Sequence, residues 1–162
     1  MSREIYPKVK LIIKNASKEA KSFDDIKIRP AHLVLSILID NDNEGVKILK
    51  KLGVDTTDFY DTISDSVRKT ELSVQIGNGS AKITLKLSDE SKAIIKLLDK
   101  ECEEIDDKII DTTHMILAIL SIKSSITQLF IDVGVTYLKY KKMIRDTKKD
   151  FTTNLYKYKQ HI

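Results

Sequence analysis

His32-Leu33-Val34-Leu35-Ser36-Ile37-Leu38 is a stretch that the chain contains twice, since 82 residues later it reads His114-Met115-Ile116-Leu117-Ala118-Ile119-Leu120. The similarity continues downstream, where residues 49–54 match residues 130–135 with Gly53 opposite Gly134, and it reaches Phe59 and Ile63, which match Tyr140 and Ile144. Self-similarity at a fixed spacing indicates a duplicated unit, so the sequence predicts a molecule with pseudo-twofold symmetry. A function carried by a pseudo-twofold surface is favoured over a single off-centre catalytic pocket.

The length and composition fit one globular domain made of two halves. A half of about 80 residues buries too little surface to be stable alone, so the two halves are expected to share a core. The chain has 162 residues, of which 41% are hydrophobic, and a single cysteine, Cys102, which cannot form an internal disulfide. The charged N-terminus does not read as a signal peptide, and the apolar runs 33–39 and 115–122 are too short to span a bilayer. These features predict a cytoplasmic protein without a membrane segment.

The positive charge is concentrated at the C-terminal end. Residues 139–162 carry eight Lys or Arg and two Asp, whereas the whole chain has a formal net charge of only +4. A basic end of this kind can contact nucleic acid or an acidic protein. A solvated helix face followed by a lysine-rich tail is the favoured interpretation.

Helical periodicity and capping residues predict four helices in each unit. In the first unit we expect helices over 2–21, from Pro30 to about Asp40, over 46–52 and from Asp55 or Thr56 onward. In the second unit Ser88 and Thr112 are predicted N-caps, a short helix covers 125–133, and the last helix begins near Thr136. Gly53 and Gly134 are expected to end helices in the left-handed conformation. The predicted fold is all-α, with two tandem four-helix repeats in a domain over 1–147 (repeat one 2–70, repeat two 88–147) and a basic tail or linker over 148–162.

The segment 71–87 between the repeats has a different pattern. Apolar and polar residues alternate on both sides of Gly77-Asn78-Gly79-Ser80. Alternation around Asn-Gly is a strong hairpin signal, so the segment is predicted to be a short β-hairpin or, alternatively, an extended linker.

Motifs for catalysis or metal binding are missing from the sequence. No glycine precedes a lysine, which excludes a phosphate-binding P-loop, and no His or Cys pair has zinc-ligand spacing. His32 and His114 are expected to cap or pack at helix starts within their own repeats, and Cys102 to be buried and inert. Acidic pairs such as Asp24-Asp25 and Asp106-Asp107 look like solvated helix ends. We therefore predict no enzyme activity, no cofactor and no metal.

The paired motifs resemble the N-terminal repeat domain of the Clp family of AAA+ unfoldases, most closely the ClpC and ClpB branches. The resemblance is carried by 28–35 and 50–55 in the first unit and by 111–117 and 133–135 in the second. It implies a non-catalytic domain that binds substrate polypeptides and adaptor proteins and passes them to the AAA+ ring of its parent or of a partner unfoldase. The isolated domain is expected to be a monomer.

The resemblance also assigns four candidate peptide- or adaptor-binding positions. The family often has Glu before each motif His and Thr at the start of each repeat's first helix, and some members recognise phosphoarginine there. In this chain the Glu positions are Ala31 and Thr113, and the helix-start positions are Tyr6 and Ser88. Because Ala31 and Thr113 offer no carboxylate to a guanidinium group, phosphoarginine recognition is not expected.

Two other functions remain open. One is a stand-alone Clp adaptor or inhibitor, which the sequence cannot distinguish from a domain of an unfoldase. The other, less favoured, is a small basic helical protein that binds nucleic acid through the C-terminal tail, in which case binding would weaken steeply with salt.

Overall fold

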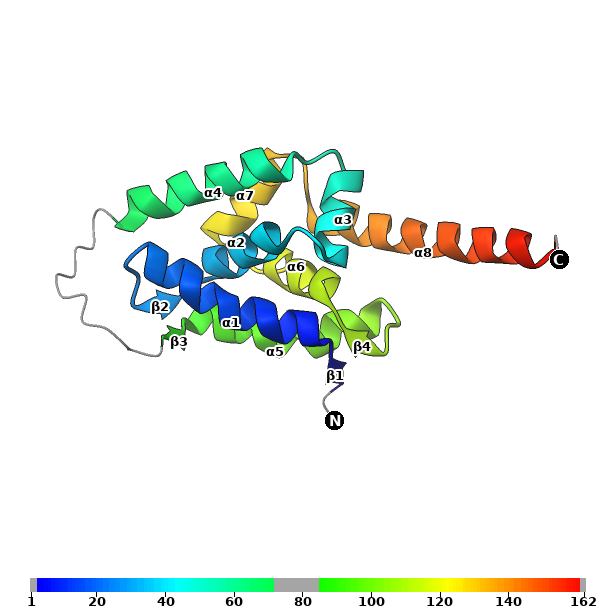
Figure 1. Ribbon diagram of the computed structural model, residues 1–162, viewed down its shortest axis with the longest axis horizontal. Coiled ribbons are helices and arrows are strands. Elements are labelled where there is room, and N and C mark those ends of the chain that lie inside the picture. Colours follow the sequence, from blue (N-terminus) through cyan, green and yellow to red (C-terminus); the bar gives the residue numbers. More distant parts are fainter. Residues whose placement is uncertain (1–2, 72–84, 161–162) are drawn as a thin grey trace.

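The computed structural model describes residues 3–71 and 85–160, and within them the helices form two similar halves (Figure 1). The first half consists of α1 (Pro7–Ser22), α2 (Pro30–Asp40), α3 (Glu44–Lys51) and α4 (Thr56–Glu71). The second consists of α5 (Asp89–Glu104), α6 (Thr112–Leu120), α7 (Ser125–Asp132) and α8 (Tyr137–Gln160). Four two-residue strands accompany them, namely β1 (Glu4–Ile5), β2 (Lys27–Ile28), β3 (Lys86–Leu87) and β4 (Ile109–Ile110). The predicted all-α fold of two tandem four-helix repeats is confirmed.

The third helix of each repeat ends in the way that its glycine predicts. Gly53 follows α3 with φ of 87°, and Gly134 follows α7 with φ of 86°. The next backbone N–H turns back in both copies, from Val54 to the Leu49 carbonyl (3.1 Å) and from Val135 to the Phe130 carbonyl (2.9 Å). Only glycine adopts this left-handed conformation without steric cost, so the same helix ending is encoded twice.

The first helix of each repeat has an equivalent ending, but with aspartate in the left-handed position. Asp24 has φ of 58° and Asp106 has φ of 64°. The N–H groups of Asp25 and Asp107 then bond to the Ala20 carbonyl (2.9 Å) and the Cys102 carbonyl (3.0 Å). This turn fixes the backbone of Asp25 and Asp107 close to the second helix of each repeat, where their side chains face His32 and His114.

Two predicted helix starts differ from the structure. The first helix begins at Pro7 rather than at residue 2, because Glu4–Ile5 forms a strand and a residue that precedes proline disfavours helical geometry. The N-cap of α6 is Asp111, not Thr112, since the Asp111 carboxylate accepts from the Thr112 N–H at 2.7 Å. The other caps are as predicted: Asp55 accepts from the Thr57 N–H (3.1 Å), and Ser88 accepts from the Ser91 N–H (3.2 Å).

The short strands cross between the repeats. Parallel pairing joins β1 to β4 and β2 to β3, so each repeat contributes one strand to each pair. The predicted hairpin lies mostly outside the described residues. Its described end, Lys86–Leu87, pairs with Lys27–Ile28 of the first repeat. Because of this exchange, the start of each repeat's first helix lies next to the second helix of the other repeat.

The shared core also joins the repeats through their later helices. The Gly45 N–H at the start of α3 donates to the Thr112 hydroxyl at 2.8 Å, and the buried Tyr140 hydroxyl of α8 donates to the Gly45 carbonyl at 3.0 Å. The rings of Phe59 on α4 and Phe130 on α7 meet edge to face, with centroids 4.9 Å apart. The two halves therefore form one packed body, as the length argument predicts.

The last helix is longer than predicted. It continues from Tyr137 to Gln160, so residues 148–160 belong to it, and its C-terminal part extends well beyond the rest of the molecule (Figure 1). Among the described residues no single helix is both long and apolar enough to cross a membrane; α6 and α7 meet that criterion only when taken together, across a bend of 103°.

Candidate functional site

Two cavities lie at equivalent places on the two sides of the pseudo-symmetric body. The first pocket, of about 400 Å³, is lined by the beginnings of α2, α5 and α7 and by the C-terminal part of α4. The second pocket, of about 290 Å³, is lined by residues at or near the beginnings of α1, α3 and α6 and by the middle of α8. Each pocket therefore combines elements of both repeats.

The four predicted site residues divide between these pockets. Ala31 and Ser88 both line the first pocket, and Tyr6 and Thr113 both line the second. Ala31 and Thr113 occupy equivalent positions in the two repeats, as do Tyr6 and Ser88. Each pocket thus receives a motif residue from one repeat and a helix-start residue from the other.

The crossed strands produce this combination. The N–H of Ser88 continues the β2–β3 pair by donating to the Ile28 carbonyl at 2.9 Å, and the N–H of Tyr6 donates in the same way to the Ile110 carbonyl at 3.0 Å. The Ser91 hydroxyl adds a further bond to the Ile28 carbonyl at 2.8 Å. These contacts hold the start of α5 against the start of α2, and the start of α1 against the start of α6.

The two motif histidines are structural. His32 and His114 are buried at the first turns of α2 and α6, and their Nδ1 atoms accept the N–H groups of Arg29 and Asp111, each at 2.8 Å. In the neutral ring the remaining proton is therefore on Nε2. The expectation that each histidine caps or packs at a helix start within its own repeat is confirmed. The Nδ1 lone pair of each ring already accepts a backbone hydrogen bond.

Each histidine faces an aspartate that the sequence interpretation placed in solvent. The His114 Nε2 lies 2.7 Å from the Asp107 carboxylate, and the His32 Nε2 lies 3.7 Å from that of Asp25, whose side chain is only 5% exposed. The prediction that these acidic pairs are solvated helix ends is therefore wrong for Asp25 and Asp107. The sequence contained a signal for these contacts, since both repeats have an Asp-Asp pair at the same distance before the motif histidine.

Burial keeps both rings neutral near pH 7. It lowers the pKa of His32 from 6.5 to about 4, with the Asp25 charge opposing and the Arg29 charge reinforcing the shift. Burial also lowers the pKa of His114, against the hydrogen bond and charge of Asp107. No group of three or more His, Cys, Asp or Glu side chains within 3–71 and 85–160 is placed to hold a metal ion.

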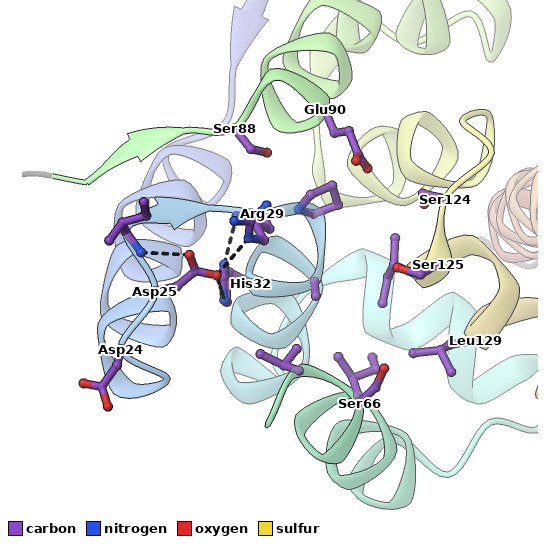
Figure 2. A pocket seen from close by; sticks show the side chains of 16 residues that line it. Asp24, Asp25, Arg29, His32, Ser66, Ser88, Glu90, Ser124, Ser125 and Leu129 are labelled. Atoms are coloured by element: carbon purple, nitrogen blue, oxygen red, sulfur yellow. Dashed lines mark hydrogen bonds and ion pairs between the residues drawn. The ribbon is translucent and has the colours of Figure 1, made fainter. Parts of the chain in front are cut away.

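The first pocket combines an apolar wall with a charged rim. Ile63, Val67 and Ile126 are buried in its lining, and Leu129 is half-buried beside them. On the opposite side Arg29 donates to the Asp25 carboxylate at 2.9 Å, and Figure 2 shows this pair next to His32. Ser88 and Glu90 approach from the start of α5, and Ser125 and Leu129 from α7 (Figure 2).

The second pocket is more polar. Lys148 of α8 donates to the Asp107 carboxylate and, at 3.1 Å, to the Ile105 carbonyl. Glu44 and Asp111 also line this pocket. Carboxylates therefore line both pockets, although they come from positions other than 31 and 113, and this contribution was missed when only those two positions were considered.

The structure thus defines a domain of two tandem four-helix repeats with a pocket on each side of their junction. The chain belongs to the family described as the Clp repeat (R) N-terminal domain, whose model matches residues 5–132. The predicted resemblance to Clp N-terminal domains is confirmed.

Curated relatives support the same family. The chaperone protein ClpB of Mycobacterium leprae (strain TN) is 26% identical over 129 residues, which is 80% of this chain and 15% of that protein. ClpB of Bacillus cereus is 28% identical over 124 residues, which is 76% of this chain and 14% of that protein. The chain thus spans about 15% of the length of the curated relatives that it matches.

Solved structures share the fold. The Hsp104 N-terminal domain from Candida albicans superimposes with a TM-score of 0.69 and 17% identity, covering 86% of this chain and 88% of that one. A structure described as part of a malarial protein secretion system gives 0.73 and 18%, covering 89% and 94%. The ClpV N-domain in complex with a VipB peptide gives 0.63 and 14%, covering 87% and 84%.

Proposed function

We propose that this chain is the substrate- and adaptor-binding domain of a Clp-type ATP-dependent unfoldase. In this proposal the chain carries out no chemistry itself; it binds polypeptides and delivers them to an AAA+ ring. The observation that supports the proposal most is the position of the four residues assigned by family resemblance. The strand pairs between the repeats bring Ala31 and Ser88 into the lining of one pocket and Tyr6 and Thr113 into the lining of the other.

Two further observations agree with polypeptide binding. The first pocket is open and has an apolar wall, which is typical of sites that accept side chains of a bound segment. A ClpV N-domain of the same fold was solved with a VipB peptide, so this fold accommodates a peptide in at least that protein. We place the domain in the cytoplasm and expect it to be a monomer in isolation.

The proposal is tested by titrating the isotopically labelled chain with reduced, carboxymethylated α-lactalbumin, which stays unfolded. We expect the amide resonances of pocket residues such as Ala31 and Ser88 to shift. Ala31→Trp should fill the first pocket and weaken binding. Ala93→Trp is the matched control, because Ala93 is exposed on α5 and is not part of either pocket lining. If the folded domain binds neither unfolded α-lactalbumin nor any adaptor protein, the proposed function is refuted.

The size of the natural gene product separates two versions of the proposal. Immunodetection in a lysate of the source cells should show a species several times heavier than 18.5 kDa if the chain is the front part of an unfoldase. A species of 18.5 kDa would instead support the stand-alone adaptor or inhibitor. In that case the test continues by measuring whether the chain binds a Clp hexamer.

A nucleic-acid-binding function receives less support from the structure. Two lysines of α8 are engaged within the protein, since Lys141 pairs with Glu104 at 3.1 Å and Lys148 bonds to the Asp107 carboxylate. These lysines are partly neutralised and are less available to phosphate groups than the sequence alone indicates.

A further inference from the structure

The two pockets differ at equivalent positions of the two repeats. The alignment that pairs Ile63 with Ile144 also pairs Val67 with Lys148, and the alignment of the third helices pairs Ile126 with Gly45. An apolar side chain of the first pocket is thus replaced by a cation at one position and by no side chain at the other. The duplicated architecture is retained and so are two apolar lining residues, since Ile144 and Ile48 of the second pocket are equivalent to Ile63 and Leu129 of the first. The chemistry differs at the pairs Val67/Lys148 and Ile126/Gly45.

The first pocket is suited to an apolar side chain. Val67 and Ile126 come from α4 and α7 and extend the wall begun by Ile63, and all three are at most 9% exposed. The cavity that they border has a volume of about 400 Å³. Leu129, which also comes from α7, lies near Ser125 and Ser66 in the same lining (Figure 2).

The rim of the first pocket is acidic. The Arg29–Asp25 ion pair neutralises one carboxylate, which leaves those of Asp24 and Glu90. Neither of these two has an ion-pair partner among the described residues. Both are exposed, and Figure 2 shows Glu90 directed toward the cavity from the start of α5. An apolar segment with neighbouring Lys or Arg therefore complements this pocket, and a phosphorylated or acidic segment is repelled.

The second pocket already contains a cation from the protein itself. Lys148 reaches from α8 to two acceptors of the α5–β4 turn, the Asp107 carboxylate and the Ile105 carbonyl at 3.1 Å. Asp107 is held in turn by the His114 Nε2 at 2.7 Å. Lys148 thus places a charged side chain in the second pocket at the position where Val67 lines the first pocket with an apolar one. A polypeptide segment that entered the second pocket would have to break the bonds of Lys148.

We propose that the domain has one client pocket rather than two. The first pocket binds apolar segments flanked by Lys or Arg, while Lys148 blocks the second pocket from inside the molecule. The residues that decide this difference are Val67 and Lys148. The proposal rests on the proposed function, because it names the substrate class and the functional half of the same pair of sites.

The test uses a fluorescein-labelled dodecapeptide, Gly-Ser-Lys-Leu-Leu-Lys-Val-Ile-Lys-Leu-Gly-Ser, and its counterpart in which every Lys is replaced by Glu. Calorimetry should give one site per chain for the Lys peptide, and the Glu peptide should bind about tenfold more weakly or worse because it faces the acidic rim. Resonance shifts should concentrate on α2, α4 and α7. Two equal sites, or equal affinity for both peptides, would overturn the proposal.

Reciprocal variants test the two deciding positions. Val67→Lys should lower affinity about tenfold, since it places a cation against the flanking Lys of the peptide, and Val67→Leu should leave affinity close to that of the natural chain. Thermal melting establishes that each variant is folded. If Val67→Lys does not fold, Leu129→Gln should lower affinity by weakening the half-buried part of the same wall. Unchanged affinity in the folded wall variants would contradict the assignment.

Lys148→Val should create a second binding site and raise the stoichiometry from one to two. The matched control is Lys141→Val, because Lys141 lies on the same helix but pairs with Glu104 outside the pocket. A stoichiometry that stays at one in Lys148→Val would show that Lys148 is not the barrier. Failure of the folded natural chain to bind both unfolded α-lactalbumin and any adaptor would instead refute the proposed function, so the two failures are distinguishable.

Discussion

Lowering the pH from 7 to 5 should destabilise the native state by about 2 kcal/mol through His32 alone. Burial at the start of α2 lowers the pKa of this ring from 6.5 to about 4. The unfolded chain therefore takes up a proton as the pH falls below 6.5, while the native chain takes up almost none until the pH nears 4. Stability from this group is fully present above the unfolded pKa and is lost as the pH falls toward the folded pKa.

The magnitude follows from proton linkage. Each pH unit over which the unfolded state holds one more proton than the native state costs about 1.4 kcal/mol. Half of the pH 7 to 6 interval lies above the unfolded pKa, so this interval contributes less than the interval from 6 to 5. The pKa of His114 is also lowered, which adds destabilisation of the same sign.

Urea unfolding followed by circular dichroism between pH 7 and 5 measures this effect, because exposed carboxylates titrate mainly below this range. The comparison variant is His32→Asn, in which the amide oxygen can still accept the Arg29 N–H that Nδ1 accepts at 2.8 Å. This variant should be less stable at pH 7, since a smaller side chain leaves a cavity, but its stability should depend less steeply on pH. If the natural chain and His32→Asn had the same pH dependence, the argument from burial would be wrong.

Three other substitutions test how the repeats and helices are held. Tyr140→Phe removes the buried bond to the Gly45 carbonyl and should cost about 1 kcal/mol, seen as a decrease of about 2–4 °C in Tm, whereas an unchanged Tm would show that the bond contributes nothing. Asn43→Ala removes the side chain that caps α3 at the Val46 N–H (3.0 Å) and also donates to the Ile37 carbonyl (3.0 Å), so urea unfolding should show a loss of about 1–2 kcal/mol. Gly53→Ala should cost about 1 kcal/mol because φ is 87°, although a Cβ there meets no atom within 4 Å; a neutral result in the same assay would show that backbone strain is absent.

The ends of the helices were largely predictable because local residues determine them. Pro30 and Asp40 bound α2 as expected, and Gly134 ends α7 by the same left-handed turn as Gly53 ends α3. The first strand was only partly predictable in this way. Pro7 disfavours helical geometry in the residue before it, but Glu4–Ile5 lies in a stretch with helical periodicity, and its pairing with Ile109–Ile110, about a hundred residues away, cannot be read from local residues.

The sequence predicted which residues belong to the candidate site, but not how they are arranged in space. Family resemblance selected Ala31 and Ser88 individually, yet their meeting in one pocket depends on a strand pair between the two repeats. Asp25 and Asp107 were interpreted as solvent-exposed because acidic residues at helix ends usually are. Their actual positions follow from the left-handed turn before them, which is local, and from the buried histidine opposite, which is a tertiary contact.

Exchange of strands between the repeats explains why both halves are needed for either pocket. The helix-start residue of the first pocket, Ser88, is held by the Ile28 carbonyl of the other repeat, and Tyr6 is held by the Ile110 carbonyl. A substitution that weakens one strand pair is therefore expected to displace one wall of one pocket, because the corresponding wall of the other pocket depends on the other strand pair. The linings also differ at the equivalent positions 67 and 148, which lie on α4 and α8, although both pockets are built from the same repeated unit.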